Sequence, residues 1–203
     1  MTTFASFLRH GSNTVLLVLA VALIALFAAR ELNFAAASFL AVAGGALVFF
    51  VSEYTTHRFM FHAPPQKNPF ILRLQHRLHY DHHITPGELG LLFLPIWFVL
   101  PVAALTFALY YGVTRDLALS AALLLGSVLG LFWYEWVHYV AHIDLVPVTP
   151  FGRWIKKYHL WHHFKNEHMW FGVTNPSMDL VGRTYARVEE VERTGTTRVL
   201  YPK

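Results

Sequence analysis

The sequence predicts an all-α integral membrane protein with about four transmembrane helices and a cytoplasmic helical cap. Of its 203 residues 55% are hydrophobic and only 14% are charged, against about 25% charged in soluble domains. Four apolar runs alternate with polar stretches, and histidines collect in those stretches. So much apolar surface exceeds what one small core can bury, which indicates a bilayer. The length suits a single membrane domain, 1–203.

The first two apolar runs predict spans at about 14–30 and 34–53. The first contains TVLLVLAVALIALFAA without a charge, and Arg30-Glu31 ends it. It is slightly short for a hydrocarbon core of about 30 Å. It also has the composition of a signal peptide with a cleavage site at 35–37, although further apolar runs follow it. The second run contains Gly44-Gly45, which would permit close helix contact.

The third and fourth runs predict spans at about 89–112 and 117–135. Pro95 and Pro101 lie in the third run, so it either kinks or breaks into a re-entrant hairpin. The fourth run continues into a histidine-bearing segment, as the second does. Pairs of prolines close both of these helices.

The remaining stretches are the histidine-rich segments 54–88 and 136–182 and the polar tail 183–203. Because the spans alternate in direction, four spans place both segments and both termini on one side. Of 16 Lys and Arg, only Arg30 and Arg115 fall in the opposite loops. The positive-inside rule therefore predicts that the site and both termini face the cytoplasm. A re-entrant third segment would overturn this count.

Ten of the 13 histidines form four clusters in these segments. Neutral imidazole is a common ligand of iron, copper and zinc. Ten imidazoles exceed what one ion can hold, so the number favours two ions. Cysteine is absent, which leaves histidine, carboxylate and water as ligands. The net charge of +4 does not indicate a nucleic-acid partner, because the basic residues flank apolar segments.

Helical spacing predicts which histidines share an ion. Residues four apart lie on one helical face, so each ion would be gripped by such pairs: His138 with His142, His79 with His83, and His159 with His163. His82 and His162 would then point toward a second ion. His57 and His62 are five apart, about 140° round an ideal helix, which suits bridging or a distorted helix end. His76 and His168 are left undecided.

A ligating histidine needs an acceptor for its other ring nitrogen. Glu53 lies four residues before His57, and Glu135 lies three before His138. Each glutamate lies on the same helical face as its histidine and could accept a hydrogen bond from the ring. A carboxylate near the lipid boundary is costly unless it is paired, which favours such a bond. Asp81 and Asp179 are further candidates.

The donor set also bears on the chemistry. Open positions on two histidine-bound irons suit the activation of dioxygen, whereas zinc with so many nitrogens would be closed and inert. Two alternatives belong to other classes: a histidine-rich metal transporter and a structural scaffold with a closed zinc site. Transport would need ligands near the bilayer midplane, and here they gather beyond the helix ends.

The motifs resemble the fatty acid hydroxylase and sterol desaturase superfamily over roughly residues 50–185. The resemblance rests on the run EYTTHRFMFH at 53–62, two H-x-x-H-H clusters at 79–83 and 159–163, and H-x-x-x-H at 138–142. Within the superfamily, HRFMFH and HHFKNEHMWFG are most similar to the fatty acid 2-hydroxylase branch. Four histidine motifs in this order are specific, whereas one alone would be weak.

The resemblance implies a dioxygen-dependent hydroxylase of a lipid acyl chain, with two iron ions that zinc can replace in a purified sample. The implied metal ligands are His57, His62, His79, His82, His83, His138, His142, His159, His162 and His163. Nothing in the chain resembles a fused cytochrome b5 domain, so a separate cytochrome b5-like or ferredoxin-like electron donor is expected. Sterol or carotenoid hydroxylation, or desaturation, remains the alternative within the superfamily.

Overall fold

The computed structural model describes residues 3–29 and 36–197, and these residues contain helices and no strand. The predicted all-α class is thereby confirmed. The chain divides into two compact units. The first unit comprises Met1–Phe50 and Leu94–Glu135, and the second comprises Val51–Phe93 and Trp136–Lys203. The expectation of one domain is not tested by this division and stays a prediction.

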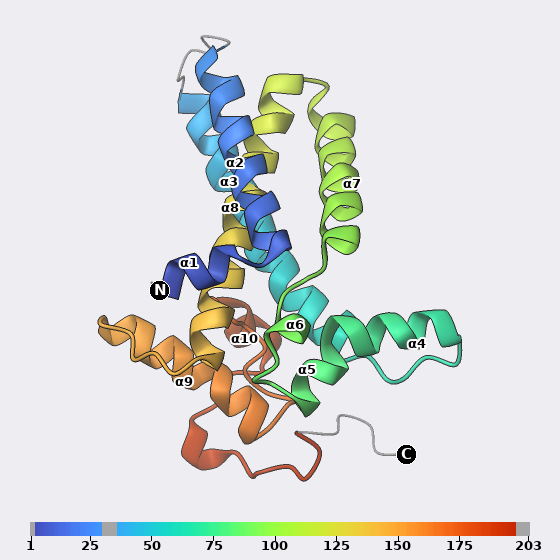
Figure 1. Cartoon of the computed structure of the whole chain (residues 1–203), viewed down its shortest axis with the longest axis vertical. Helices are drawn as coiled ribbons and strands as arrows, with labels where there is room; N and C mark the ends of the chain where they lie inside the picture. Colours follow the sequence, from blue (N-terminus) through green and yellow to red (C-terminus); the bar gives the residue numbers. More distant parts are fainter. Residues whose placement is uncertain (1–2, 30–35, 198–203) are drawn as a thin grey trace. The chain divides into compact units, whose positions relative to one another are not determined.

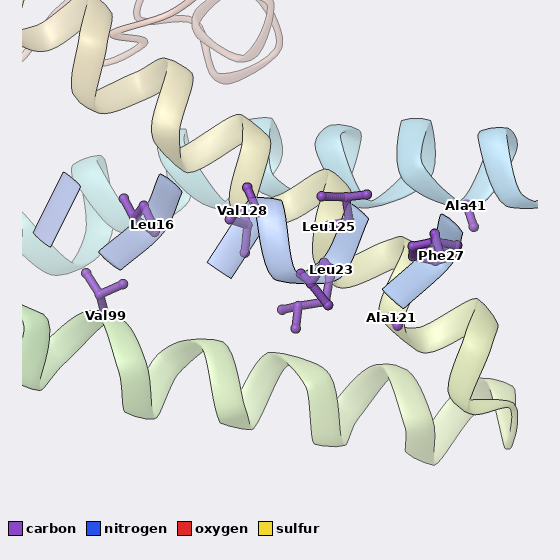
Figure 2. Packing of buried hydrophobic residues seen from close by; sticks show 11 residues of the cluster. Leu16, Leu23, Phe27, Ala41, Val99, Ala121, Leu125 and Val128 are labelled. Atoms are coloured by element: carbon purple, nitrogen blue, oxygen red, sulfur yellow. The ribbon is translucent and has the colours of Figure 1, made fainter. Parts of the chain in front are cut away.

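The first unit is built from apolar helices. They are α1 (Thr3–Leu8), α2 (Gly11–Ala29), the first part of α3 (Ala36–Thr56), α7 (Ile96–Thr114) and most of α8 (Leu117–His142) (Figure 1). Its core joins all four long helices: Leu16 and Leu23 of α2 pack with Val99 of α7 and Val128 of α8, and Ala41 adds the contribution of α3 (Figure 2). Many apolar side chains of α2, α3 and α7 are exposed, as expected for lipid-facing surface.

A glycine contact brings α3 and α8 close together. A Cβ on Gly45 would lie 1.9 Å from the carbonyl oxygen of Leu123, and one on Gly126 would lie 1.9 Å from that of Val42. Ser127 adds a hydrogen bond of 3.0 Å from its hydroxyl to the carbonyl of Gly45. Small residues at such crossings allow the backbones to approach. Of the Gly44-Gly45 pair, Gly45 makes this contact.

Within the described residues, three helices are long and apolar enough to cross a membrane: Ala37–Phe61, Leu89–Thr114 and Leu117–His142. The first apolar helix qualifies only as a shorter one, over Gly11–Phe27, so the count of four spans stays a prediction. The polar loop expected at 30–33, including Arg30, and the cleavage site considered at 35–37 fall wholly or partly outside the described residues. The sidedness deduced from Arg30 and Arg115 also stays a prediction.

Proline determines the course of the third apolar run. Pro95 has extended backbone and precedes α7, while Pro101 lies inside that helix. The short α6 (Leu89–Leu92) ends before Pro95. From Ile96 to Thr114 the helix is continuous, so the chain forms one helix here instead of a re-entrant hairpin.

The second unit consists of shorter helices that carry the histidines. They are the end of α3, η1 (His57–Phe61), α4 (Pro69–Gln75), η2 (His76–Tyr80), α5 (Asp81–Ile84), α6, the end of α8, α9 (Pro150–Phe164), α10 (Ser177–Gly182) and η3 (Val188–Glu190). Two of these helices start in the same way. Asn68 caps α4 by accepting from Phe70 N at 2.9 Å, and Thr149 caps α9 by accepting from Gly152 N at 3.0 Å. Proline follows each cap, at a position where its missing N–H costs nothing.

Two π-helical segments interrupt the regular helices, η1 at His57–Phe61 and η2 at His76–Tyr80. In η1 the amide of His62 donates to the carbonyl of His57 at 3.1 Å, a bond between residues five apart. Such π segments are rare and occur often at functional sites. Both begin at a histidine, so the histidine motifs of the sequence coincide with local departures from α-helix.

Candidate metal centre

The ten clustered histidines come together in two groups of five, all within the second unit. In each group one ring nitrogen of every residue lies within 4.8 Å of the others. Group A is His57, His62, His79, His83 and His162; group B is His82, His138, His142, His159 and His163. Nine of the ten residues are buried, and His142 is half-buried.

The grouping follows the helical spacing. Residues four apart fall in the same group: His79 and His83 in group A, and His138 with His142, like His159 with His163, in group B. The middle histidine of each H-x-x-H-H motif belongs to the other group. Each motif therefore serves both groups, and His57 and His62 join one group through the π segment.

The ring nitrogens of group A are too crowded for a hydrogen-bonded network. His79 Nε2 lies 3.1 Å from His57 Nε2, 2.8 Å from His62 Nε2 and 3.0 Å from His83 Nε2. A neutral ring nitrogen carries either one proton or one lone pair, so it cannot form three hydrogen bonds with three nitrogens at once. Such an arrangement fits ligands that share a cation.

Main-chain carbonyls fix the tautomer of three rings in group A. The acceptors are Phe171 O for His57 Nδ1 at 2.5 Å, Met169 O for His162 Nδ1 at 2.8 Å, and Thr197 O for His83 Nδ1 at 3.0 Å. A carbonyl can only accept, so each Nδ1 carries the proton and each Nε2 presents its lone pair to the centre of the group. Converging lone pairs repel one another unless a cation lies between them, so this group fits a metal ion.

Group B has the same inward arrangement of Nε2 atoms. His138 Nε2 lies 3.0 Å from His82 Nε2, and His142 Nε2 lies 2.9 Å from His159 Nε2. His163 stacks on His83 of group A with ring centroids 4.2 Å apart. The two groups are therefore in direct contact within the second unit.

Burial keeps the imidazoles neutral. It lowers the pKa of His83 to about 3, and burial together with the neighbouring imidazoles lowers the pKa values of His62, His79, His82, His159, His162 and His163 well below the ordinary value. Desolvation disfavours the charged ring in each case. At neutral pH these nitrogens are available as metal ligands.

One loop, residues 169–174, supplies two of the three carbonyls, and two buried carboxylates hold it. Asp179 of α10 accepts from Phe171 N at 2.8 Å through Oδ1 and from Gly172 N at 2.7 Å through Oδ2. Glu53 of α3 accepts from Val173 N at 2.7 Å and from Thr174 N at 2.9 Å. Four consecutive amides thus bind to two carboxylates, which fixes the loop that holds His57 and His162.

Each of the four carboxylates predicted as a partner of a metal-ligating imidazole makes a contact elsewhere. Glu53 and Asp179 bind amides of the loop, Asp81 Oδ1 lies 2.8 Å from His76 Nδ1, and Glu135 Oε1 accepts from Leu94 N at 3.1 Å. Their direct role beside metal ligands stays a prediction. His76 is partly exposed and belongs to neither group. His168 is also outside them, with its Nε2 3.5 Å from Glu167.

Lys156 of α9 holds the end of α8 in place. Its ammonium donates to the carbonyls of Val140, Ile143 and Leu145 at 3.0, 2.7 and 2.9 Å. A cation at a helix C-terminus satisfies carbonyls that have no helical partner. Because α8 carries His138 and His142 while α9 carries His159 and His163, this contact ties together two of the three helices that supply group B. The sequence did not predict this role, because Lys156 and the adjacent Lys157 cannot be told apart by residue type.

Comparison with known proteins decides the family. The sequence model of the family described as fatty acid hydroxylase matches residues 42–184. The chain belongs to the fatty acid hydroxylase family. The matched range includes all ten clustered histidines, and the resemblance inferred from the motifs is confirmed.

Curated relatives in this family are fatty acyl hydroxylases. The ceramide very long chain fatty acid hydroxylase SCS7 of Saccharomyces cerevisiae is 36% identical over 148 residues, which are 70% of this chain and 36% of that protein. The dihydroceramide fatty acyl 2-hydroxylase FAH2 of Arabidopsis thaliana is 34% identical over 143 residues, 70% of this chain and 59% of that protein. The fatty acid 2-hydroxylase of Rattus norvegicus is 29% identical over 140 residues, 66% of this chain and 36% of that protein.

A solved structure supports the fold assignment. The full-length scs7p structure, in which only the hydroxylase domain is visible, matches with a TM-score of 0.74 and 29% identity. The match covers 89% of this chain and 66% of that one. The chain spans little more than a third of the length of the yeast and rat relatives.

Proposed function

We propose that this protein is a membrane-bound enzyme that uses dioxygen to hydroxylate a lipid acyl chain, at carbon 2 of a fatty acyl group. The observation that carries the proposal is the convergence of ten clustered imidazoles into two groups of five, with three Nε2 lone pairs of group A fixed inward. Family membership and the names of the relatives favour a fatty acyl substrate over a sterol or a carotenoid.

Two iron ions are the proposed cofactor. Group A would hold one ion, and group B would hold the other. The chemistry that bound iron supplies is activation of dioxygen for cleavage of an unactivated C–H bond. The net change consumes the C–H group, dioxygen, two electrons and two protons, and yields C–OH and water. The electrons would come from a separate donor, cytochrome b5-like or ferredoxin-like.

The protein's own residues would provide ligands, orientation and exclusion of water. Neutral imidazoles present lone pairs, main-chain carbonyls hold the rings, and burial keeps bulk water from the centre. Two of the apolar helices, α3 and α8, lead directly into histidines of the centre, which supports an acyl chain of the bilayer as the substrate. A cytoplasmic position of the centre and of both termini is part of the proposal.

A metal transporter is the competing function from another class. Its ion path would need ligands near the bilayer midplane. No histidine occurs at 11–56 or 84–137, which include nearly all of the apolar runs. This distribution favours the enzyme.

The test combines metal analysis with lipid analysis. Cells that express the wild-type chain should contain 2-hydroxylated fatty acyl lipids labelled from ¹⁸O₂, and the purified protein should contain two metal ions per chain. His142→Ala and His162→Ala, one variant for each group, should abolish the product. A product without the ¹⁸O label, or metal flux into vesicles without any lipid product, would overturn the proposal.

A further inference from the structure

The end of the described chain lies in the polar tail that the sequence predicts at 183–203, and it is bound into the second unit. Thr197 is 6% exposed, and its carbonyl accepts the Nδ1 proton of His83 at 3.0 Å. His83 belongs to group A. Residues 192–197, called here the C-terminal strap, therefore contribute one of the three carbonyls that orient this group.

The strap is fastened to the residues that directly follow α9. Thr194 N donates to Lys165 O at 2.9 Å, and Asn166 Nδ2 donates to Glu192 O at 3.2 Å. The hydroxyls of Thr194 and Thr196 donate to the two carboxylate oxygens of Glu167, whose side chain is 1% exposed. The main-chain and side-chain contacts together fix the register of the strap.

Glu167 and the strap depend on each other for their hydrogen bonds. A buried carboxylate is costly unless donors satisfy it, and two hydroxyls from the strap supply one donor to each oxygen. Exposed His168 lies 3.5 Å from the same carboxylate. Loss of the two hydroxyls would leave a buried charge beside the strap, so the strap would be expelled instead of merely loosened.

We propose that the C-terminal strap is a positioning element of the metal centre, with Glu167 as its anchor and the Thr197 carbonyl as its contact to His83. The inference rests on the proposed metal-binding function. The strap acts on group A through His83, so its loss should weaken the binding of one ion of two. Neither the H-x-x-H-H motifs nor the metal ligands include any residue of the strap.

The experiment compares two double variants of the full chain, purified in detergent and loaded with Co²⁺. Thr194→Val/Thr196→Val removes both hydroxyls, whereas Thr194→Ser/Thr196→Ser keeps them. In the valine variant the affinity for one of the two Co²⁺ ions should fall roughly 10- to 100-fold, the range for lost partners of metal-bound histidines, and a chelator should remove that ion faster. The serine variant should match wild type, and the cobalt absorption bands should change only in the valine variant.

Wild-type release of both ions by the valine double variant would overturn the proposal, as would equal acceleration for both ions. If the valine double variant unfolds, Thr196→Val alone decides: faster release with a retained fold supports the strap, and wild-type release overturns it. A wild-type chain that binds no Co²⁺ would instead contradict the proposed function.

Discussion

The Nδ1 of His57 lies 2.5 Å from the carbonyl oxygen of Phe171, although 114 residues separate the two in the chain. This contact connects the end of α3 with the loop at 169–174. The loop also supplies the carbonyl of Met169 to His162. Orientation of two histidines in group A therefore depends on how firmly this loop is held.

Replacement by the corresponding amide should destabilise the protein at one of the two carboxylates that hold the loop but not at the other. Each carboxylate oxygen of Asp179 accepts one main-chain amide. In Asp179→Asn an NH₂ group replaces one of these oxygens in either orientation of the side chain, so one main-chain N–H loses its acceptor and faces another donor. We expect a loss of about 1–3 kcal/mol in the free energy of unfolding and faster metal release. Thermal unfolding and chelator challenge measure both.

Glu53→Gln is the matched comparison. Its Oε1 accepts both amides and its Oε2 accepts the Thr174 hydroxyl. A glutamine can keep Oε1 in place and donate its NH₂ to that hydroxyl oxygen, so stability and metal release should stay close to wild type. Equal damage from the two substitutions would contradict this assignment of the acceptors.

Lys156 should support group B through the end of α8. Lys156→Met keeps the aliphatic length but leaves the carbonyls of Val140, Ile143 and Leu145 without their shared donor. We expect faster loss of one metal ion and a lower melting temperature. Lys157→Met is the control at an exposed neighbour. Identical metal release in both variants would rule out the proposed support.

The crossing of α3 and α8 should tolerate a methyl group at Gly44 but not at Gly45. A Cβ at Gly44 would meet Leu123 Cδ2 at an ordinary 3.5 Å, whereas at Gly45 it would overlap the carbonyl of Leu123. Gly45→Ala should lower the free energy of unfolding by roughly 1–3 kcal/mol. Unfolding curves in one detergent compare the pair, and equal stability of the two variants would refute the close crossing.

The histidines outside the two groups should be dispensable for metal. His76→Ala and His168→Ala should keep both ions, since neither residue belongs to group A or group B. His62→Ala, at a member of group A, should lose one ion. Elemental analysis of the purified variants gives the count, and a missing ion in either of the first two would add that residue to the ligands.

The spacing of the histidines in the sequence was enough to predict much of the membership of the two groups. Residues four apart on a helix share a face, so pairs such as His138 and His142 could be assigned together. The pair His57 and His62 could not be assigned, because the bond between residues five apart in η1 replaces the regular helix. A π segment has no distinctive composition that would reveal it.

The acceptors of the ring protons were out of reach for a different reason. Carboxylates are the acceptors that the sequence predicts, because they can be recognised as residue types. The structure uses main-chain carbonyls at Met169, Phe171 and Thr197, and every residue has one. Only the path of the chain decides which carbonyl meets which ring, and that path depends on distant contacts such as those of Asp179, Glu53 and Glu167.

The order of the ligands along the chain has a consequence for biosynthesis. Each group takes histidines from η2 or α5 and from α9, so neither group is complete until α9 has left the ribosome. During most of translation the early imidazoles can offer only a partial and weakly selective set of donors. Selective binding of the proposed ions would therefore begin only once α9 has emerged, and the cell would have to supply those ions at that stage.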